Sequence, residues 1–263
     1  MQYSCGYWEP SNTQNFKLFD QPSKPLTLTR AQLQKMNLIE RKLKLTPDCR
    51  VLDIGCGFGT LAHHLSLSCK QVVGITLSEN QYMWATQMFK DEIKTGKLSF
   101  LLSDYRTLPK VLGKFDRIVS VGFLEHVGVH NMHHLSEVVN FHLKEDGIVC
   151  LHTIGKESNS HETSAFIRKY IFPGGQLPTM PDIINSFTYF RMEDWHNFGQ
   201  DYSLTLDAWQ NNLSHIHFDD LKSSRLWELY LTACSAAFKV RKLQLWQVVF
   251  TKKTSTKEYR SLR

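Results

Sequence analysis

The stretch VLDIGCGFG, Val51–Gly59, decides the fold of this chain. An apolar strand runs directly into three alternating glycines. This pattern predicts a sharp turn that brings the backbone close to a ligand with no Cβ in the way. The spacing departs from G-x-G-x-x-G, in which a helix N-terminus reaches the pyrophosphate of a dinucleotide. The tighter loop favours a nucleoside ligand without phosphate, and S-adenosylmethionine is the commonest one.

A second apolar strand, QVVGITL (Gln71–Leu77), ends about where the ribose of a nucleotide should lie. Folds of this kind usually place Asp or Glu at the end of that strand to hold the ribose hydroxyls. Here the position holds Thr76-Leu77-Ser78, with Gln81 a few residues on. Because no Asp or Glu stands at the end of the second strand, fewer classes of nucleotide-binding α/β protein are compatible with the sequence.

Short apolar runs rich in β-branched residues alternate with segments of helical periodicity up to residue 155. This alternation predicts an α/β, doubly wound fold, with a parallel sheet covered by helices on both faces. An amphipathic helix is expected over 29–45. The polar, then aromatic and proline-punctuated range 155–190 is expected to be an inserted lid, and a helix and a last strand follow it. We expect a single domain over 1–263, with strands at RVLDIG, QVVGITL, KLSFLLSD, FDRIVSVG, DGIVCLHTI and LQLWQVVFTKK.

The composition is that of an ordinary globular protein, with 263 residues, 42% hydrophobic and 21% charged. No apolar run approaches the ~20 residues that span a bilayer, and the N-terminus does not have the pattern of a signal peptide. The six cysteines are scattered without C-x-x-C pairs, which argues against a zinc site or a disulfide framework. We therefore expect reduced thiols in a cytoplasmic protein.

The net charge of +6 is compatible with an anionic partner such as membrane phospholipid. Part of the excess lies in the basic tail TKKTSTKEYRSLR, over 251–263. Such a tail can contact a lipid surface, or it can be a solvated chain end. A nucleic-acid partner is not expected, because no recognisable nucleic-acid-binding module accompanies the charge.

Polar residues gather at the predicted carboxyl ends of the strands, where doubly wound sheets bind their ligands. An acid-plus-histidine set beside a glycine loop is expected to handle an anion or a proton, although any one member can equally be a surface or capping residue. In strand order these residues are Gly55 and Gly57, Thr76 and Gln81, Asp104 and Tyr105, Glu125 and His126, and His152 and Ile154.

Motifs spread over essentially the whole chain resemble the cyclopropane-fatty-acid synthases. They are QYSCGYW (Gln2–Trp8), VLDIGCGFG, GITLSENQ, FDRIVSVGFLEHVG, LHTIG, KYIFPGGQLP, MEDWHNFGQDY and LQLWQVVF. The resemblance implies a mostly parallel, seven-stranded sheet of the class I S-adenosylmethionine methyltransferase type. It also implies methyl transfer from S-adenosylmethionine to the cis double bond of an unsaturated phospholipid acyl chain, followed by cyclopropane ring closure.

The same resemblance implies which residues bind the methyl donor. Gln81 would take the ribose role of the absent acid, and Asp104 and Tyr105 would lie beside the adenine. The full set is Tyr3 and Ser4, then Val51, Leu52, Asp53, Ile54, Gly55, Cys56, Gly57, Phe58 and Gly59, then Thr76, Leu77, Ser78, Glu79, Asn80 and Gln81, and last Asp104 and Tyr105.

In this family a bound bicarbonate is the base that allows the ring to close. The matching catalytic residues are Cys5, Glu125, His152, Ile154 and Tyr202, with backbone N–H groups from Cys5 and Ile154. Cys234 matches a cysteine sometimes assigned to the active site of the family. Its apolar neighbours and the absence of a base partner in the sequence favour an inert buried thiol instead.

An alkene is a poor nucleophile, so the reaction depends on alignment, and aromatic faces can stabilise the resulting carbocation. Phe172, Trp195, Phe198 and Trp209 are candidates for an acyl channel or for ordinary core. Arg168 and Lys169 are candidates for contact with lipid headgroups or for a solvated face. The implied partners are membrane phospholipid, through peripheral contact, and a second copy of the chain in a homodimer.

Two departures from the family pattern leave alternatives open. Phe58 stands where relatives usually have Trp, and relatives carry residues before QYSCGYW that close over the cofactor, whereas this chain starts at Met1. We expect an internal gene start, a fragment or a lost cover. The alternatives are a methyltransferase acting on an amine or a branched fatty acid, and an inactive remnant that binds cofactor or lipid. Glu125, His152 and Tyr202 favour ring closure, because an amine acceptor has less need of that base.

Overall fold

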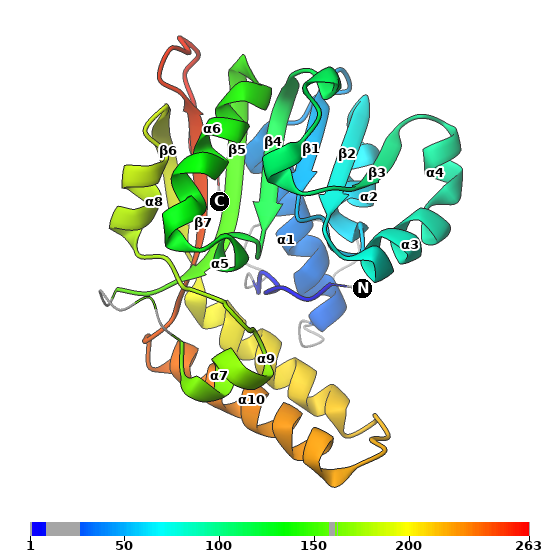
Figure 1. The fold of residues 1–263 in the computed structure, drawn as a ribbon, viewed down its shortest axis with the longest axis vertical. Coiled ribbons are helices and arrows are strands. Elements are labelled where there is room, and N and C mark those ends of the chain that lie inside the picture. The colour runs from blue at the N-terminus through cyan, green and yellow to red at the C-terminus, as the bar shows by residue number, and fades with distance from the viewer. Residues whose placement is uncertain (1, 9–26, 158–160, 162, 263) are drawn as a thin grey trace, which may run out of the picture.

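The computed structural model describes residues 2–8, 27–157, 161 and 163–262. Its centre is a seven-stranded sheet with the strand order β3-β2-β1-β4-β5-β7-β6 (Figure 1). Adjacent strands run parallel except at β7, which is antiparallel to both β5 and β6. The predicted doubly wound, mostly parallel sheet is confirmed. The strands are β1 Arg50–Ile54, β2 Gln71–Thr76, β3 Leu98–Leu102, β4 Phe115–Val121, β5 Leu143–Gly155, β6 Phe190–Asn197 and β7 Gln244–Lys252.

Two hydrophobic clusters cover the two faces of the sheet because successive strand side chains point to opposite sides. Leu52 of β1 packs in the cluster that includes Leu135, and Val51 packs in the one that includes Ile39. In Figure 1 α6 lies in front of the sheet and α1 behind it. The α-helices are α1 Leu28–Leu43, α2 Thr60–Ser66, α3 Glu79–Met88, α4 Lys90–Lys94, α5 Leu124–Val127, α6 Met132–His142, α7 Ala165–Tyr170, α8 Met180–Ser186, α9 Gly199–Leu213 and α10 Leu221–Lys239.

The helix α1 is the element expected over 29–45. It begins where the Thr27 hydroxyl accepts the N–H of Arg30, and it ends at Lys44, whose backbone is left-handed at φ 47°. The face turned to the protein interior includes two lysines, Lys35 and Lys42, among apolar residues such as Leu38. Two buried charges on one helix face are unusual, and they bear on the site described below.

Two elements that the sequence analysis did not predict are β6 and α9. The polar composition of β6, FRMEDWHN, and an irregularity between Met192 and Asp194 hide its strand period. The helix α9 packs against α10, and with α7 the pair projects beyond the carboxyl ends of the parallel strands (Figure 1). Within the range expected to be a lid, α8 packs against α6, so the lid stays a prediction. The segment SNTQNFKLFDQPSKP, over 11–25, whose Ser, Asn and Pro content predicts a loop, lies outside the described residues.

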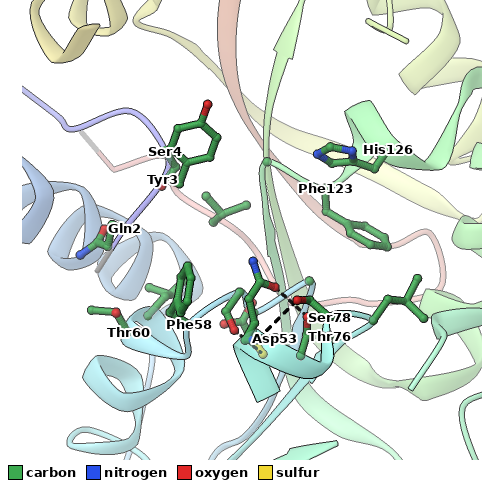
Figure 2. A pocket seen from close by; sticks show the side chains of 18 of the residues that line it. Gln2, Tyr3, Ser4, Asp53, Phe58, Thr60, Thr76, Ser78, Phe123 and His126 are labelled. Carbon is green, nitrogen blue, oxygen red and sulfur yellow. Dashed lines mark hydrogen bonds between the residues drawn. The ribbon is translucent and has the colours of Figure 1, made fainter. Parts of the chain in front are cut away.

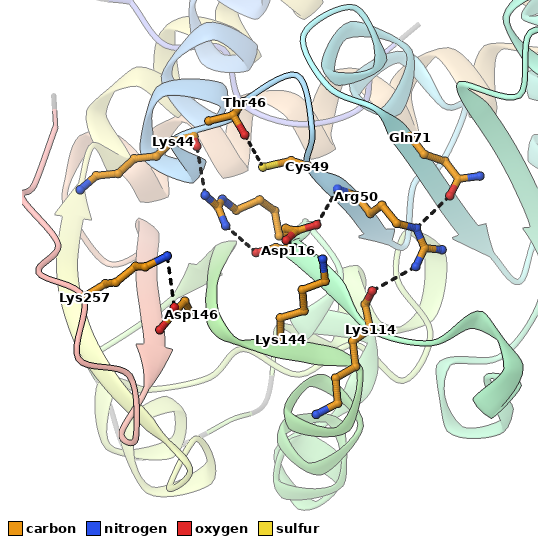
Figure 3. Close-up of polar contacts among 11 residues, drawn as sticks. Lys44, Thr46, Cys49, Arg50, Gln71, Lys114, Asp116, Lys144, Asp146 and Lys257 are labelled. Carbon is orange, nitrogen blue, oxygen red and sulfur yellow. Dashed lines mark hydrogen bonds and ion pairs between the residues drawn. The ribbon is translucent and has the colours of Figure 1, made fainter.

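The amino edge of the sheet, where the parallel strands start, carries paired charges (Figure 3). Lys144 lies 2.8 Å from Asp116, and Lys257 of the basic tail lies 3.1 Å from Asp146. The Tyr259 hydroxyl donates to the Lys42 carbonyl at 3.0 Å. The tail therefore packs at the edge of the sheet opposite the glycine loop. Among the helices of the described ranges, none is both long and apolar enough to cross a membrane.

Candidate active site

The glycine loop makes a turn that only glycine fits. Gly55 has φ 77°, and a Cβ there would lie 2.6 Å from the Phe123 ring. Gly59 has φ 74°, and its Cβ would lie 2.5 Å from the Phe100 ring. Both positions need the left-handed backbone and the missing side chain. The N–H groups of Gly55 and Cys56 both donate to the Ile75 carbonyl, which ties the turn to β2.

A cavity of about 450 Å³ opens above this turn at the carboxyl ends of β1, β2 and β4 (Figure 2). We call it the glycine-loop cavity. Eleven of the nineteen residues expected to bind the donor line it: Tyr3, Ser4, Asp53, Gly55, Cys56, Gly57, Phe58, Thr76, Leu77, Ser78 and Gln81. The other eight, Val51, Leu52, Ile54, Gly59, Glu79, Asn80, Asp104 and Tyr105, do not reach its wall.

Two hydrogen bonds within the segment from Thr76 to Gln81 fix the position of the Gln81 side chain and backbone. The Thr76 hydroxyl donates to Gln81 Oε1 at 2.9 Å, and the Ser78 hydroxyl accepts the Gln81 N–H at the start of α3. The Thr76 bond uses one of the two lone pairs of Oε1, and the amide nitrogen of Gln81 can donate to a ligand in the cavity that the residue lines. Gln81 therefore presents donors where a conventional acid would present acceptors.

Asp104 pairs locally instead of facing the glycine-loop cavity. Arg106 binds both of its carboxylate oxygens, with Nε 3.0 Å from Oδ1 and Nη2 2.5 Å from Oδ2. These hydrogen bonds from Arg106 lower the pKa of Asp104. Contact between Asp104 and an adenine stays a prediction.

A smaller cavity of about 100 Å³, the polar cavity, brings four of the expected catalytic residues together. Glu125, His152, Ile154 and Tyr202 all line it. Glu125 Oε1 accepts the Ile154 N–H at 2.6 Å, so this backbone donor already has a partner within the chain. The fifth expected residue, Cys5, is fully buried but does not line the cavity, and its thiol donates to the Gly6 carbonyl.

Burial shifts the pKa values of both Glu125 and His152 in the direction that favours the neutral form. It raises the pKa of Glu125 to about 7. The pKa of His152 lies well below its ordinary value, first because of burial and then because of the positive charges of Lys35 and Lys42. The amide nitrogen of Gln247 lies 3.2 Å from His152 Nδ1, within hydrogen-bond distance. Among the described residues, neither His152 Nε2 nor Glu125 Oε2 has a hydrogen-bond partner.

A third cavity of about 690 Å³, the apolar cavity, lies between α7, α9 and α10 and adjoins the polar cavity. Ile154, Phe172, Tyr202 and Tyr230 line both. Three of the four aromatic residues considered for an acyl channel do not line it. Trp195 packs on Trp246, and Trp209 stacks on Tyr3 with 5.2 Å between the ring centroids. Phe198 belongs to a buried hydrophobic cluster that also contains Cys5.

Cys234 lines the apolar cavity and not the polar one. Burial raises the pKa of its thiol to about 11. A thiol in this state is protonated near neutral pH and is a weak nucleophile. The geometry therefore favours the interpretation of Cys234 as a packing residue.

The sequence analysis missed several residues that line the cavities. Lys35 lines the glycine-loop cavity, and Tyr230 lines the other two. A signal existed for both. Lys35 lies four residues after Ala31 and seven before Lys42, which places it on the buried stripe of α1, and Tyr230 lies one helical turn before Cys234. Gln2 and Phe123 also line the glycine-loop cavity and lie within motifs that the analysis singled out, and His126, which lines it too, was among the residues expected at the strand ends.

Comparison with known proteins agrees with this geometry. Residues 1–248 match the family described as mycolic acid cyclopropane synthetase. The cyclopropane-fatty-acyl-phospholipid synthase of Escherichia coli strain K12 is 41% identical over 96% of this chain, and the chain spans 62% of the length of that relative.

Two solved structures are similar over most of the chain. The cyclopropane synthase MmaA2 from Mycobacterium tuberculosis superposes with a TM-score of 0.83 at 28% identity, covering 95% of this chain and 90% of that one. The mycolic acid cyclopropane synthase CmaA1, solved in complex with SAH and CTAB, has a TM-score of 0.82 at 27% identity with the same coverage. The resemblance expected from the motifs is confirmed, and this chain belongs to the mycolic acid cyclopropane synthetase family.

Proposed function

We propose that this chain transfers the methyl group of S-adenosylmethionine to the cis double bond of an unsaturated phospholipid acyl chain and closes a cyclopropane ring. One observation carries the proposal, namely that the three cavities adjoin in the order the reaction needs. The glycine-loop cavity shares Tyr3 and Ser4 with the polar cavity, and the polar cavity shares Ile154 and Tyr202 with the apolar one. Donor, base and acceptor can therefore meet at one point.

The glycine-loop cavity has the features of a site for S-adenosylmethionine, which when bound supplies an electrophilic methyl group. Its turn at Gly55–Gly59 has a tighter glycine spacing than the G-x-G-x-x-G of pyrophosphate-binding loops, and the Gln81 amide lies beside β2 in the cavity wall. The relative CmaA1 was solved with SAH. In this chain the loop and Gln81 would hold the nucleoside, while Tyr3 and Ser4 close the cavity on the side of the polar cavity.

The apolar cavity suits an acyl chain because aliphatic and aromatic side chains form most of its wall. Aromatic rings gather where it meets the polar cavity. The ring centroid of Phe172 lies 6.2 Å from that of Tyr3 and 6.1 Å from that of Tyr230. The hydroxyl oxygens of the two tyrosines lie 3.0 Å apart. Their faces can stabilise the positive charge that develops on the acceptor after methyl transfer.

The polar cavity fits a small anion such as bicarbonate, which when bound supplies the base for ring closure. Two buried polar atoms at this cavity, Glu125 Oε2 and His152 Nε2, have no partner among the described residues, and a native site rarely leaves such atoms unsatisfied. The imidazole of His152 would donate a hydrogen from Nε2 while Nδ1 contacts the Gln247 amide, and Glu125 with its pKa of about 7 can offer one as an acid. Both, with the Tyr202 hydroxyl, would orient the base beside the acceptor.

The substrate sets where the protein would work. A phospholipid acceptor places it at the membrane surface, and we propose a cytoplasmic protein in peripheral contact with lipid. The projecting helices α7, α9 and α10 enclose the apolar cavity, so this end of the molecule would meet the bilayer. We carry the homodimer expected from the resemblance as part of the same proposal, to be tested by light scattering on the purified chain.

The test is incubation of the purified chain with S-adenosylmethionine and phospholipid vesicles that contain cis-unsaturated chains. We expect a gain of one CH₂ in those chains by mass spectrometry and no change in fully saturated vesicles. Unchanged unsaturated lipid would overturn the proposal.

The matched acceptors in the same assay separate the alternatives. Methyl transfer to an added amine or branched fatty acid, without transfer to the alkene, would identify a different methyltransferase. Binding of S-adenosylhomocysteine without transfer to any acceptor would identify a cofactor-binding remnant.

A further inference from the structure

The ammonium group of Lys35 is an unexpected part of the wall of the glycine-loop cavity. Lys35 is 2% exposed and lines this cavity together with Asp53, which is 1% exposed. A charge buried to this degree is costly unless it is paired. The partners of Lys35 therefore indicate what the cavity is built to hold.

The three hydrogen-bond partners that Lys35 has among the described residues are neutral. Its Nζ donates to Gln2 Oε1 at 2.5 Å, to Ser4 Oγ at 2.7 Å and to Gln32 Oε1 at 2.8 Å. Within the described ranges no carboxylate forms an ion pair with it. The positive charge at this wall therefore has no counter-ion in hydrogen-bond contact.

Lys42 on the same helix gives the contrast. It lies seven residues after Lys35 on the same buried face, and its ammonium is 3.1 Å from the Asp194 carboxylate. That lysine is neutralised inside the protein and lines none of the three cavities. The same helix thus carries one buried lysine in direct contact with a carboxylate and one that faces a cavity, where the carboxyl group of Asp53 acts on it only through space.

The hydrogen bonds of Lys35 also set the polarity of its neighbours. Ser4 Oγ accepts from Lys35, and the Ser4 carbonyl accepts from Gln32 Nε2 at 2.6 Å. With its oxygens used in this way, Ser4 keeps its hydroxyl hydrogen for a ligand. The wall near Lys35 therefore offers positive charge and a donor, which is the chemistry that recognises a carboxylate.

We propose that Lys35 is the residue that recognises the α-carboxylate of the methyl donor, through its charge and through the Ser4 hydroxyl that it orients. Asp53 lines the same cavity, and its Oδ2 has no partner in the described part of the chain, so it complements the donor's α-ammonium. The pair would match the zwitterionic amino-acid end of the donor. This inference rests on the proposed function, because it takes S-adenosylmethionine as the ligand.

The test is calorimetric titration with two ligands that differ only in the carboxylate, S-adenosylhomocysteine and its decarboxylated analogue. We expect the wild-type chain to prefer the first by about 30-fold, as for a hydrogen bond to a charged group. Lys35→Met should remove most of that preference by weakening S-adenosylhomocysteine binding, with the analogue changed by less than about threefold. The matched control Arg41→Met removes an exposed charge from the same helix and should leave both affinities as they are.

Several outcomes would overturn the inference. Equal wild-type affinity for the two ligands would do so without any variant, so the test survives a Lys35→Met chain that does not fold. An equal loss for both ligands in a Lys35→Met chain with unchanged Tm would show a purely structural role. Wild-type binding of S-adenosylhomocysteine with no methyl transfer to lipid would overturn the proposed function alone, whereas no binding at all would overturn both.

Discussion

The two edges of the parallel sheet use charge in opposite ways. At the amino edge the charged groups are partly exposed and paired, as in Lys144–Asp116, where the side chains are 49% and 23% exposed. At the carboxyl edge Lys35, Asp53 and Glu125 are all at least 90% buried, and none of them forms an ion pair with a described residue. Paired surface charges contribute little to stability, whereas a buried ionisable group without an ion-pair partner is costly to charge. We infer from this difference that the groups at the carboxyl edge serve to bind ligands, and that their burial lowers the stability of the folded chain.

The largest expected effect tests whether Glu125 acts in the chemistry. Glu125→Gln keeps the shape and the acceptor for the Ile154 N–H but removes the acid. We expect methyl transfer to lipid at saturating donor to fall by about 10²–10⁴-fold, the range for a group that positions or moves a proton. The measurement is radiolabelled methyl incorporation into phospholipid.

The control for that variant lies at the other edge. Asp116→Asn makes the same chemical change at a paired carboxylate, and its transfer rate should stay within about twofold of wild type. A wild-type rate in Glu125→Gln would remove this carboxylate from the reaction.

The second prediction concerns stability and pH. Burial raises the pKa of Glu125 from 4.5 to about 7, so between these pH values the folded state holds a proton that the unfolded state has lost. Stability from this group is therefore present at low pH and is lost as pH rises to 7, by ~3 kcal/mol at ~1.4 kcal/mol per pKa unit. In urea unfolding, the free energy of unfolding of Glu125→Gln should rise relative to that of wild type as the pH increases over this range.

At the amino edge, the pH dependence of stability from Asp116 should have the opposite sign to that from Glu125. Burial alone would raise the pKa of Asp116, but hydrogen bonds from Lys144 and from the Arg50 N–H lower it overall. Its contribution is present above its unfolded pKa of 3.8 and is lost as pH falls. If the stabilities of Glu125→Gln and wild type changed in parallel from pH 4.5 to 7, ionisation of the buried Glu125 would not cost stability, and the prediction would be wrong.

The third prediction separates backbone strain from crowding in the glycine loop. Gly59 and Gly96 have nearly the same positive φ, 74° and 77°, but a Cβ on Gly59 meets the Phe100 ring while one on Gly96 meets nothing within 4 Å. We expect Gly96→Ala to cost about 1 kcal/mol and Gly59→Ala about 2–4 kcal/mol by urea unfolding. Equal losses would mean that the loop is not closely packed.

The smallest effect belongs to the amino edge. Lys144→Ala breaks a 2.8 Å ion pair between two partly exposed side chains. Its cost should stay below about 1 kcal/mol, and donor affinity and transfer rate should not change. A loss of donor affinity measured by calorimetry would show that the two edges are coupled.

Much of the fold was predictable because it depends on local patterns. Apolar strands followed by glycine, and their alternation with helical segments, predicted the parallel strands and the loop at Gly55–Gly59. The strand β6 was missed, because an edge strand with charged residues and an irregular register has no clear alternation. The helix α9 was missed although MEDWHNFGQDY, which spans its start, had been singled out as a motif.

The site was predictable in part of its residues and not in its contacts. Glu125, His152, Ile154 and Tyr202 do meet in one cavity, as expected from strand ends and motifs. That the Ile154 N–H is taken by Glu125 depends on a contact 29 residues apart in sequence. No local pattern carries that information, because a hydrogen-bond partner is chosen by the packing of α5 against β5.

The amino-acid sequence was enough to predict the parallel strands, the glycine turn and most of the chemical groups at the carboxyl edge. These depend on periodicity and on glycine's backbone freedom, which are properties of neighbouring residues. Only the tertiary structure decided which charges are neutralised. Lys35 and Lys42 are equivalent in the pattern of α1, yet β6 brings Asp194 to one of them and a cavity faces the other. Burial and pairing arise from contacts between distant segments, so the fold alone selects which lysine can meet a ligand.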